Sequence, residues 1–456
     1  MLPVILAGLI AQSIIPALGA SAAHPHQDVL NAPPPGFSYR IPQGTHPWTS
    51  SAAVKTNKHK HSENVQKIRA FRGGKTNARS VAAVLGAHQR QVGGFGYQNI
   101  STTTSYGTQY AAEVTWHRQN LWLLLDTGSS DTWAVRENFK CIDYSGQVVS
   151  QGACGFGPTY RSGFQYGHVT PEQHMFIQYG DGEIVTGPMG LSDITVANIT
   201  VSMQEVCLAN ATYWYGNNLT SGLLGLAYPS LTNAYLGSSV DHDFNTQVEY
   251  SPLFTTMVDQ GLVPPIFSVA IDRNSSTGML AWGGIAPATG ADFSQVATLD
   301  LIITNLIDLP ATAYEYSFYT IIPDSWQYDS VSDTRKLPYI VDSGTTLCYL
   351  PPQIAEAINN AFQPAAVYLW MYGAFFTSCN ATPPRISVKL GGINFYFNPV
   401  DLIYRNMVDP LTGMCMTAIA SGGSGPFILG DAFMQNAVAV FDVGEAKMRF
   451  VPREFY

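Results

Sequence analysis

Short apolar runs separated by polar and Gly-rich turns characterise the chain from about residue 100 onward. The segments YAAEVTW (110–116) and LWLLLD (121–126) have the composition of strands, and the polar HRQN lies between them. The Gly-rich EIVTGPMGLSDITV (183–196) continues this pattern. The best helix candidate is PPQIAEAINNAF (351–362), because prolines lead into it and apolar positions recur three and four residues apart. The pattern therefore predicts an all-β fold with few helices.

The strand pattern occurs twice, which indicates that the chain consists of two related halves. Two pairs of motifs mark the repeat: LLDTGSS (124–130) with GLLGLA (222–227), and YIVDSGTT (339–346) with FILGD (427–431). In each pair an apolar strand ends in Asp, a hydroxyl residue and Gly, and a second strand carries Gly after aliphatic residues. Two halves related by a pseudo-two-fold axis would bring Asp126 and Asp342 face to face.

The repeated Asp motif has a physical purpose. Gly lets the chain turn sharply out of a buried strand, and the flanking hydroxyls can hold the carboxylate by hydrogen bonds. Two carboxyl groups about 3 Å apart share one proton over a wide acidic range, and aspartic-protease dyads are the known example of this effect. The ionised group can take a proton from water while the neutral group donates to the carbonyl under attack. Asp126 and Asp342 therefore predict general acid–base hydrolysis.

At these residues the sequence resembles a pepsin-like aspartic endopeptidase of the secreted, fungal zymogen type, over roughly residues 105–456. Five motifs carry the resemblance: DTGSSDTW, YGDG, GLLGLAYPS, IVDSGTT and FILGD. It implies a bilobal pepsin-like fold, with two pseudo-two-fold related β-barrel-like lobes and a cleft between them. It also implies cleavage of protein and peptide substrates at acidic pH, with hydrophobic residues preferred on both sides of the scissile bond. No cofactor and no metal are expected, and pepstatin-type compounds should inhibit.

The resemblance implies that Asp126 and Asp342 are the catalytic pair. The hydroxyl three residues after each Asp would hydrogen-bond its outer oxygen, and the hydroxyl directly after each Asp would bond the opposite loop. The glycine between them would form the turn beside the bound peptide. These supporting residues are Thr127, Gly128, Ser129, Ser343, Gly344 and Thr345.

The resemblance also identifies a flap. Tyr179 matches the flap tyrosine, which in the family closes over the substrate and bonds to the tryptophan that Trp133 matches. Gly180 and Asp181 would contact the substrate, and Leu223 would line the pocket before the scissile bond. Without the resemblance, YGDG between strands predicts only a hairpin turn.

Three positions bear on how far the resemblance can be carried over. Glu183 stands after the flap glycine, where many relatives have a small hydroxyl residue, and this change would alter subsite preference. HRQN (117–120) replaces the usual Gly-Pro-containing turn, which an exposed turn tolerates. Asp431 matches a common family residue near the floor of the active site, and we expect a structural role for it.

The first 22 residues predict a secretory signal, with an A-x-A-like site at residues 20–22; an uncleaved membrane anchor is the alternative. No later apolar run is long enough to span a membrane, and the C-terminus carries no lipid-anchor signal. Six sequons fit the secretory route: Asn99, Asn198, Asn210, Asn218, Asn274 and Asn380. We expect a secreted protein without a stable membrane anchor, with the vacuole as second choice.

The chain has six cysteines, an even number that suits an oxidising compartment. Fifteen pairings are possible, and proximity in sequence favours Cys141–Cys154 and Cys379–Cys415. The other two, Cys207 and Cys348, lie in apolar segments. Two buried free thiols are the favoured interpretation, and a third disulfide is the alternative.

Charge divides the chain into a small basic part and a large acidic part. Residues 23–100 hold 10 Lys and Arg against 2 Asp and Glu, whereas residues 101–456 hold 13 against 30. We interpret residues 23–95 as an inhibitory prosegment, held by charge and released in acid, with the mature start between about 80 and 100. The alternative is a solvated leader. An N-terminal lobe with the flap (96–297) and a C-terminal lobe (298–456) follow.

Other classes of function lack support. The acidic body disfavours a nucleic-acid partner, and the sequence has no H-E-x-x-H zinc motif, no G-x-S-x-G elbow and no phosphate-binding loop. An inactive pepsin-fold binding or inhibitor protein is the main alternative. We expect a monomer whose partners are its substrates and its own prosegment.

Overall fold

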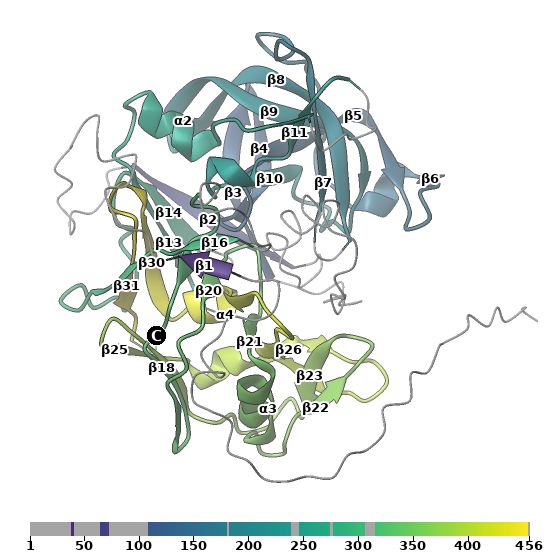
Figure 1. Ribbon diagram of the computed structural model, residues 1–456. Helices are drawn as coiled ribbons and strands as arrows, with labels where there is room; N and C mark the ends of the chain where they lie inside the picture. The colour runs from purple at the N-terminus through teal and green to yellow at the C-terminus, as the bar shows by residue number, and fades with distance from the viewer. Residues whose placement is uncertain are drawn as a thin grey trace, which may run out of the picture. The chain divides into compact units, whose positions relative to one another are not determined.

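The computed structural model describes residues 38–40, 64–72, 108–179, 182–238, 246–273, 277–305 and 315–454. These described residues belong to one compact unit. Strands dominate, as the sequence pattern predicts (Figure 1). The predicted helix at 351–362 is present as α3 (Pro352–Asn360), and the other α-helices are α2 (Leu253–Asp259) and α4 (Asp431–Met434) within the described residues. The fold class is therefore confirmed as all-β.

The largest sheet carries the first motif pair. Its strands, in spatial order, are β12 (Gln247–Val248), β11 (Ala234–Leu236), β7 (Gln173–Gln178), β8 (Ile184–Val196), β9 (Ile199–Tyr213), β5 (Thr132–Ile142), β10 (Gly222–Gly225), β4 (Gln119–Asp126), β3 (Thr108–Trp116), β2 (Asn64–Arg72), β14 (Thr277–Trp282), β13 (Ile266–Ile271), β30 (Ala437–Asp442), β31 (Lys447–Pro452) and β15 (Ala297–Asp300). Strand β6 (Val148–Val149) pairs with β5. The HRQN turn joins β3 to β4, with positive φ at His117 and Arg118, as a tight hairpin turn requires.

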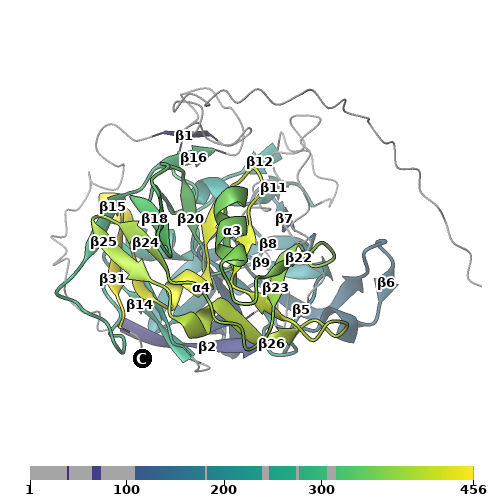
Figure 2. The same cartoon turned by 90° about the horizontal axis from the view of Figure 1, so that it is seen from below.

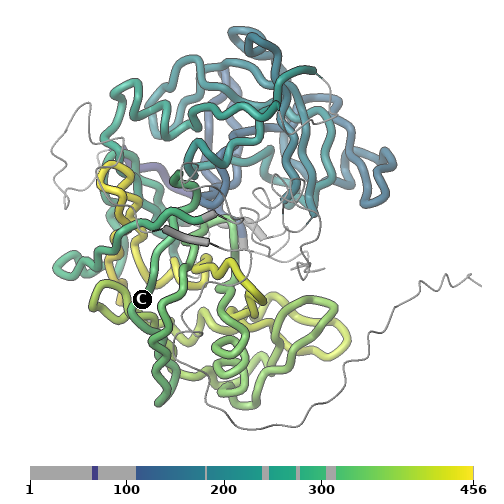
Figure 3. The backbone as a smooth tube through the Cα atoms, in the orientation of Figure 1, coloured from purple at the N-terminus to yellow at the C-terminus, as the bar shows by residue number. Residues whose placement is uncertain are grey.

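Apart from β15, β30 and β31, the strands of the second half form smaller sheets. One has the order β17 (Thr320–Ile321), β20 (Tyr339–Val341), β29 (Phe427–Leu429), β21 (Cys348–Leu350) and β28 (Ile419–Ser421). A second has β19 (Val331–Asp333), β18 (Ser325–Tyr328), β24 (Ile386–Leu390) and β25 (Ile393–Tyr396). A third has β22 (Val367–Leu369), β23 (Ala374–Thr377), β27 (Cys415–Thr417) and β26 (Ile403–Val408), and β1 (Ser38–Arg40) pairs with β16 (Ile303–Asn305). In Figure 3 most of the first half is coloured blue to teal and most of the second half green to yellow, so the two can be told apart by colour.

The two halves repeat one local arrangement of strands. Strand β10 lies between β4, to which it is parallel, and β5, to which it is antiparallel, so that Gly225 is opposite Asp126. Strand β29 lies in the same way between β20 and β21, with Leu429 opposite Val341. Each strand that ends in Asp therefore has an aliphatic strand directly beside it, as the motif repeat predicts.

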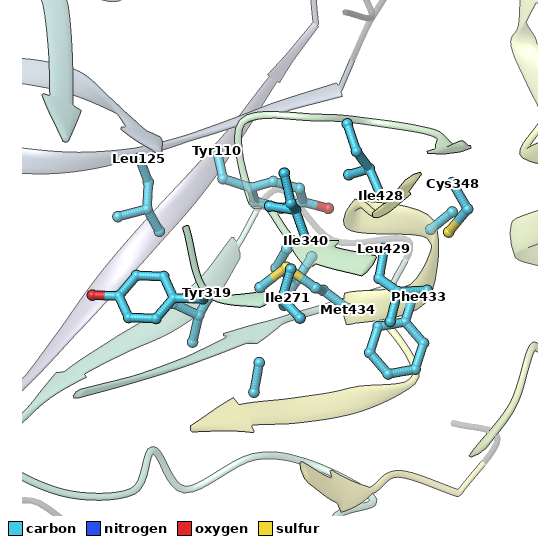
Figure 4. Close-up of a cluster of buried hydrophobic side chains, with 14 of the residues drawn as sticks. Tyr110, Leu125, Ile271, Tyr319, Ile340, Cys348, Ile428, Leu429, Phe433 and Met434 are labelled. Carbon is cyan, nitrogen blue, oxygen red and sulfur yellow. The ribbon is translucent and has the colours of Figure 1, made fainter. Parts of the chain in front are cut away.

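A hydrophobic core lies beneath both Asp motifs. Leu125 precedes the first Asp, Ile340 lies two residues before the second, and both belong to one buried cluster with Leu429 and Met434 (Figure 4). Helix α3 adds Ile354 to the same cluster through its apolar face. Because this core contains residues from both halves and is closely packed, it holds the two Asp motifs in place.

Strand β2 comes from the segment interpreted as a prosegment. It pairs with β3 on one side and with β14 on the other, and Ile68 is fully buried. Figure 2 shows β2 on the same side of the molecule as β14. The assignment of residues 23–95 as a prosegment stays a prediction.

Candidate active site

Asp126 ends strand β4 and is completely buried. The N–H of Gly128 donates to its Oδ1 at 2.8 Å, and the hydroxyl of Ser129 donates to its Oδ2 at 2.6 Å. Each oxygen therefore has a donor from the turn that follows. Hydrogen bonds of this kind orient a carboxyl group and favour its ionised form.

Asp342 follows strand β20 and has the same surroundings. The N–H of Gly344 donates to its Oδ1 at 2.8 Å, and the hydroxyl of Thr345 donates to its Oδ2 at 2.5 Å. Asp342 is also fully buried. The structure thus places two carboxyl groups at the ends of two equivalent strands, with equivalent donors.

Close approach of the two Asp loops depends on a glycine. A Cβ atom added to Gly344 would lie 2.5 Å from Oδ1 of Asp126 and 2.8 Å from its Cγ. A side chain at this position would therefore collide with the opposite carboxyl group. The main chain of the second loop lies directly against the acid of the first.

Hydroxyl residues link the two loops. The N–H of Thr127 donates to Oγ of Ser343 at 3.2 Å, and the N–H of Ser343 donates to Oγ1 of Thr127 at 3.0 Å. The two hydroxyls then donate to main-chain carbonyls of the opposite strand, at Val341 and Leu125. All of these groups are buried, so the bonds hold the loops in fixed register.

The later aliphatic strands close the space under the Asp loops. The N–H of Leu226 donates to the main-chain oxygen of Asp126 at 2.9 Å, and the N–H of Asp342 donates to Leu429 at 3.1 Å. A Cβ on Gly225 would lie 2.5 Å from the main chain of Ser130, and one on Gly430 would meet carbonyl oxygens at 2.3 Å. Both glycines are thus required by close backbone contact.

Asp431 is buried and interacts electrostatically with the acid pair. It begins α4 and is 1% exposed, and neither carboxyl oxygen has a hydrogen-bond partner among the described residues. Burial raises the pKa of Asp431 well above its usual value, and the charges of Asp342 and Asp126 raise this pKa further. Three carboxyl groups therefore interact, and Asp431 favours its neutral form.

The flap hairpin consists of β7, β8 and the turn between them. The N–H of Tyr179 donates to the main-chain oxygen of Glu183 at 2.8 Å, and Gly182 has a φ of 86°. The indole Nε1 of Trp133 donates to the hydroxyl of Tyr179 at 2.9 Å. This is the bond that the resemblance implies between these two residues. Gly180 and Asp181 lie outside the described residues.

Trp214 is a residue that the sequence motifs did not identify. Its ring centre lies 5.7 Å from that of Tyr179 and 5.0 Å from that of Trp133, edge to face in both cases. Leu223 belongs to the same buried cluster and is paired with Trp133 across β10 and β5. The only sequence signal was the aromatic run TYWY (212–215), which by itself predicts burial.

A second buried acid group lies behind the first Asp motif. Asp131 accepts hydrogen bonds from the main chain and side chain of Asn233 and from the hydroxyl of Tyr250. Burial raises the pKa of Asp131 in spite of these bonds. Burial, with the charge of Asp131 as the lesser cause, raises the pKa of the neighbouring Glu205 to about 7.

Both disulfides favoured by sequence proximity, Cys141–Cys154 and Cys379–Cys415, are present. Cys207 and Cys348 are free and buried, in agreement with the favoured interpretation. Among the sequons, Asn198, Asn218 and Asn380 are exposed, Asn210 is partly buried, and Asn99 and Asn274 lie outside the described residues. Within the described part of the chain, no group of three or more His, Cys, Asp or Glu residues is arranged to hold a metal ion.

The chain is similar to known proteins along most of its length. The chain is 40% identical to a probable aspartic-type endopeptidase of Aspergillus fumigatus, over 75% of this chain and 78% of that protein. It is 26% identical to an acid protease of Saccharomycopsis fibuligera, over 72% and 76%. The crystal structure of an aspartic proteinase from Irpex lacteus shares the fold, with a TM-score of 0.58, 18% identity, and coverage of 86% of this chain and 98% of that one. The family model described as eukaryotic aspartyl protease matches residues 109–453. The chain therefore belongs to the eukaryotic aspartyl protease family.

Proposed function

We propose that Asp126 and Asp342 carry the aspartic endopeptidase activity of this chain. The single observation that supports this most is the equivalent hydrogen bonding of two buried carboxyl groups at the ends of related strands. One carboxylate takes a proton from a water molecule, and the other, protonated, donates to the carbonyl oxygen of the scissile bond. No covalent intermediate forms in this scheme.

The substrate is an extended peptide with hydrophobic residues on both sides of the scissile bond. Tyr179, Trp214 and Leu223 support this preference, because they belong to one apolar cluster that includes the flap tyrosine. Main-chain bonds supply part of the affinity in this mode of binding, and side-chain pockets supply the specificity.

The protein is made as a secreted zymogen. The predicted signal at residues 1–22 and the basic segment at 23–95 support this, and none of the described helices is long and apolar enough to cross a membrane. Acid protonates the carboxylates that attract the basic segment, which is then released. N-terminal sequencing before and after acidification tests this step, and an unchanged N-terminus alongside rising activity would contradict it.

The activity test uses unfolded haemoglobin or casein at about pH 3 to 5, with and without pepstatin. The unmodified protein should cleave, and Asp126→Asn and Asp342→Asn should lose cleavage while keeping their fold. Asp300→Asn is a matched control, because Asp300 is exposed and forms its ion pair with Lys447 at the surface. Absence of pepstatin-sensitive cleavage after acid activation would favour the inactive binding protein instead.

A further inference from the structure

Glu183, which directly precedes β8, has a buried carboxyl group beside the turn of the flap hairpin. The side chain has no exposed surface, and its Oε1 accepts a hydrogen bond of 2.7 Å from the N–H of Tyr215. Its main-chain oxygen accepts the bond of 2.8 Å from Tyr179. One residue thus bonds the flap tyrosine through its main chain and the segment after β9 through its side chain.

The segment after β9, residues 214–218, is itself firmly held. The N–H of Gly216 donates to the main-chain oxygen of Cys154 at 2.9 Å, and Cys154 forms a disulfide with Cys141. A Cβ atom on Gly216 would lie 1.9 Å from the oxygen of Gly155, so the two backbones are in close contact. The hydrogen bond from Tyr215 therefore attaches the flap to a disulfide-bonded part of the lobe.

The aromatic contacts of the flap depend on the same segment. Trp214, adjacent to Tyr215, lies edge to face against Tyr179, and Tyr179 in turn accepts the bond from Trp133. A shift of residues 214–218 relative to the flap would separate these rings. The carboxyl group of Glu183 is placed to prevent that shift.

We propose that Glu183 is a positioning residue, which fixes Tyr179 and Trp214 relative to each other before substrate binds. This inference rests on the proposed function. A serine side chain at position 183 would be shorter by two carbon atoms and would leave the N–H of Tyr215 without this acceptor. The flap then has more conformational freedom to lose on binding.

This role predicts a particular kinetic pattern. Ordering the more mobile flap costs the same free energy in the substrate complex and in the transition state. The change therefore weakens substrate binding, so KM rises, and it leaves kcat unchanged. For Glu183→Ser we expect KM to rise about 10-fold, which corresponds to the loss of one buried hydrogen bond. Glu183→Gln keeps an acceptor oxygen and should restore KM to within about threefold of the unmodified protein.

The test measures KM and kcat of the activated enzyme with a fluorogenic peptide that has apolar residues on both sides of the scissile bond. Glu356→Ser, on the exposed face of α3, is the matched control for loss of one acid. The proposal would be overturned if KM were unchanged in Glu183→Ser, or if KM rose as much in Glu183→Gln as in Glu183→Ser. If the Ser variant does not fold, Glu183→Met keeps the length and removes the acceptor.

Amide hydrogen exchange of Tyr215 provides a measurement that does not depend on activity. Exchange should be faster in Glu183→Ser and unchanged in Glu183→Gln, and equal exchange in all variants would overturn the positioning role. If the unmodified protein shows no pepstatin-sensitive cleavage, the proposed function fails, whereas the exchange rates still decide whether Glu183 holds the segment.

Discussion

Thr127 and Ser343 exchange hydrogen bonds across the two halves of the protein, although 216 residues separate them in sequence. Each hydroxyl accepts from the main-chain N–H of the other residue and donates to a carbonyl beyond it. The two Asp loops are therefore tied by their own neighbours rather than by distant parts of the fold. Both the activity and the stability of the protein should therefore depend on the hydrogen bonds between Thr127 and Ser343.

Removing the Thr127 hydroxyl should affect both properties. Thr127→Val keeps the shape but leaves the N–H of Ser343 and the carbonyl of Val341 without their partner. We expect a loss of about 2–4 kcal/mol in the free energy of unfolding, from two buried polar groups, and a fall in kcat. Urea unfolding and kinetics measure these effects. Thr127→Ser is the control, and equal stability of the two variants would show that the link is weak.

Substitution of Gly344 should affect activity most. An added methyl group would lie 2.5 Å from Oδ1 of Asp126, which Gly128 already holds. We expect Gly344→Ala to lower kcat by about 100-fold or more, since a small displacement of a reacting group has effects of this size. Gly163→Ala, at a position with no atom within 4 Å of the new methyl group, should leave kcat unchanged. Comparable kcat values in the two variants would refute the prediction.

Asp431 should help to sustain activity at higher pH. Because burial and the charges of Asp342 and Asp126 raise the pKa of Asp431, it is neutral in acid and gains a charge only as the pH rises. That charge repels a second negative charge on the pair, so it disfavours loss of the proton that the pair shares. Asp431→Asn should therefore move the alkaline limb of kcat/KM to lower pH, as measured between about pH 3 and 7. Superimposable profiles would show that Asp431 does not influence the reaction.

Glu205 should make the protein less stable toward neutral pH. Burial and the charge of Asp131 raise the pKa of Glu205 to about 7, above its value in the unfolded chain. The folded state then binds the extra proton between these two values, so the free energy of unfolding falls as the pH rises through that range. Glu205→Gln should match the unmodified protein near pH 4 and have a Tm a few degrees higher near pH 7.5. Glu356→Gln, an exposed change, should show no such difference.

The sequence predicted those parts of the fold and site that local patterns encode. Asp126 and Asp342 could be found because each ends an apolar strand in a repeated motif, and the structure places them in equivalent surroundings. Helix α3 is predictable because its apolar positions follow the helical period, Pro351 precedes it and Pro352 is its first residue.

Relationships between distant segments were not predictable from such patterns. Trp214 lies in an aromatic run that resembles any buried strand, and only the tertiary structure places it against Tyr179. In the sequence Glu183 differs from the family pattern, but nothing local shows that its partner is the main chain of Tyr215. The proximity of Asp431 to the acid pair likewise depends on the pairing of β29 with β20.

The position of β2 has a consequence for processing of the chain. Residues 64–72 are hydrogen-bonded on both sides, to β3 and to β14. A cut between about residues 80 and 100, where we expect the mature start, would separate this strand from the rest of the chain. If the cleaved peptide then dissociated, β3 and β14 would become open edges available to other extended chains. Maturation therefore has to supply a replacement strand, or the freshly cleaved protein becomes liable to self-association.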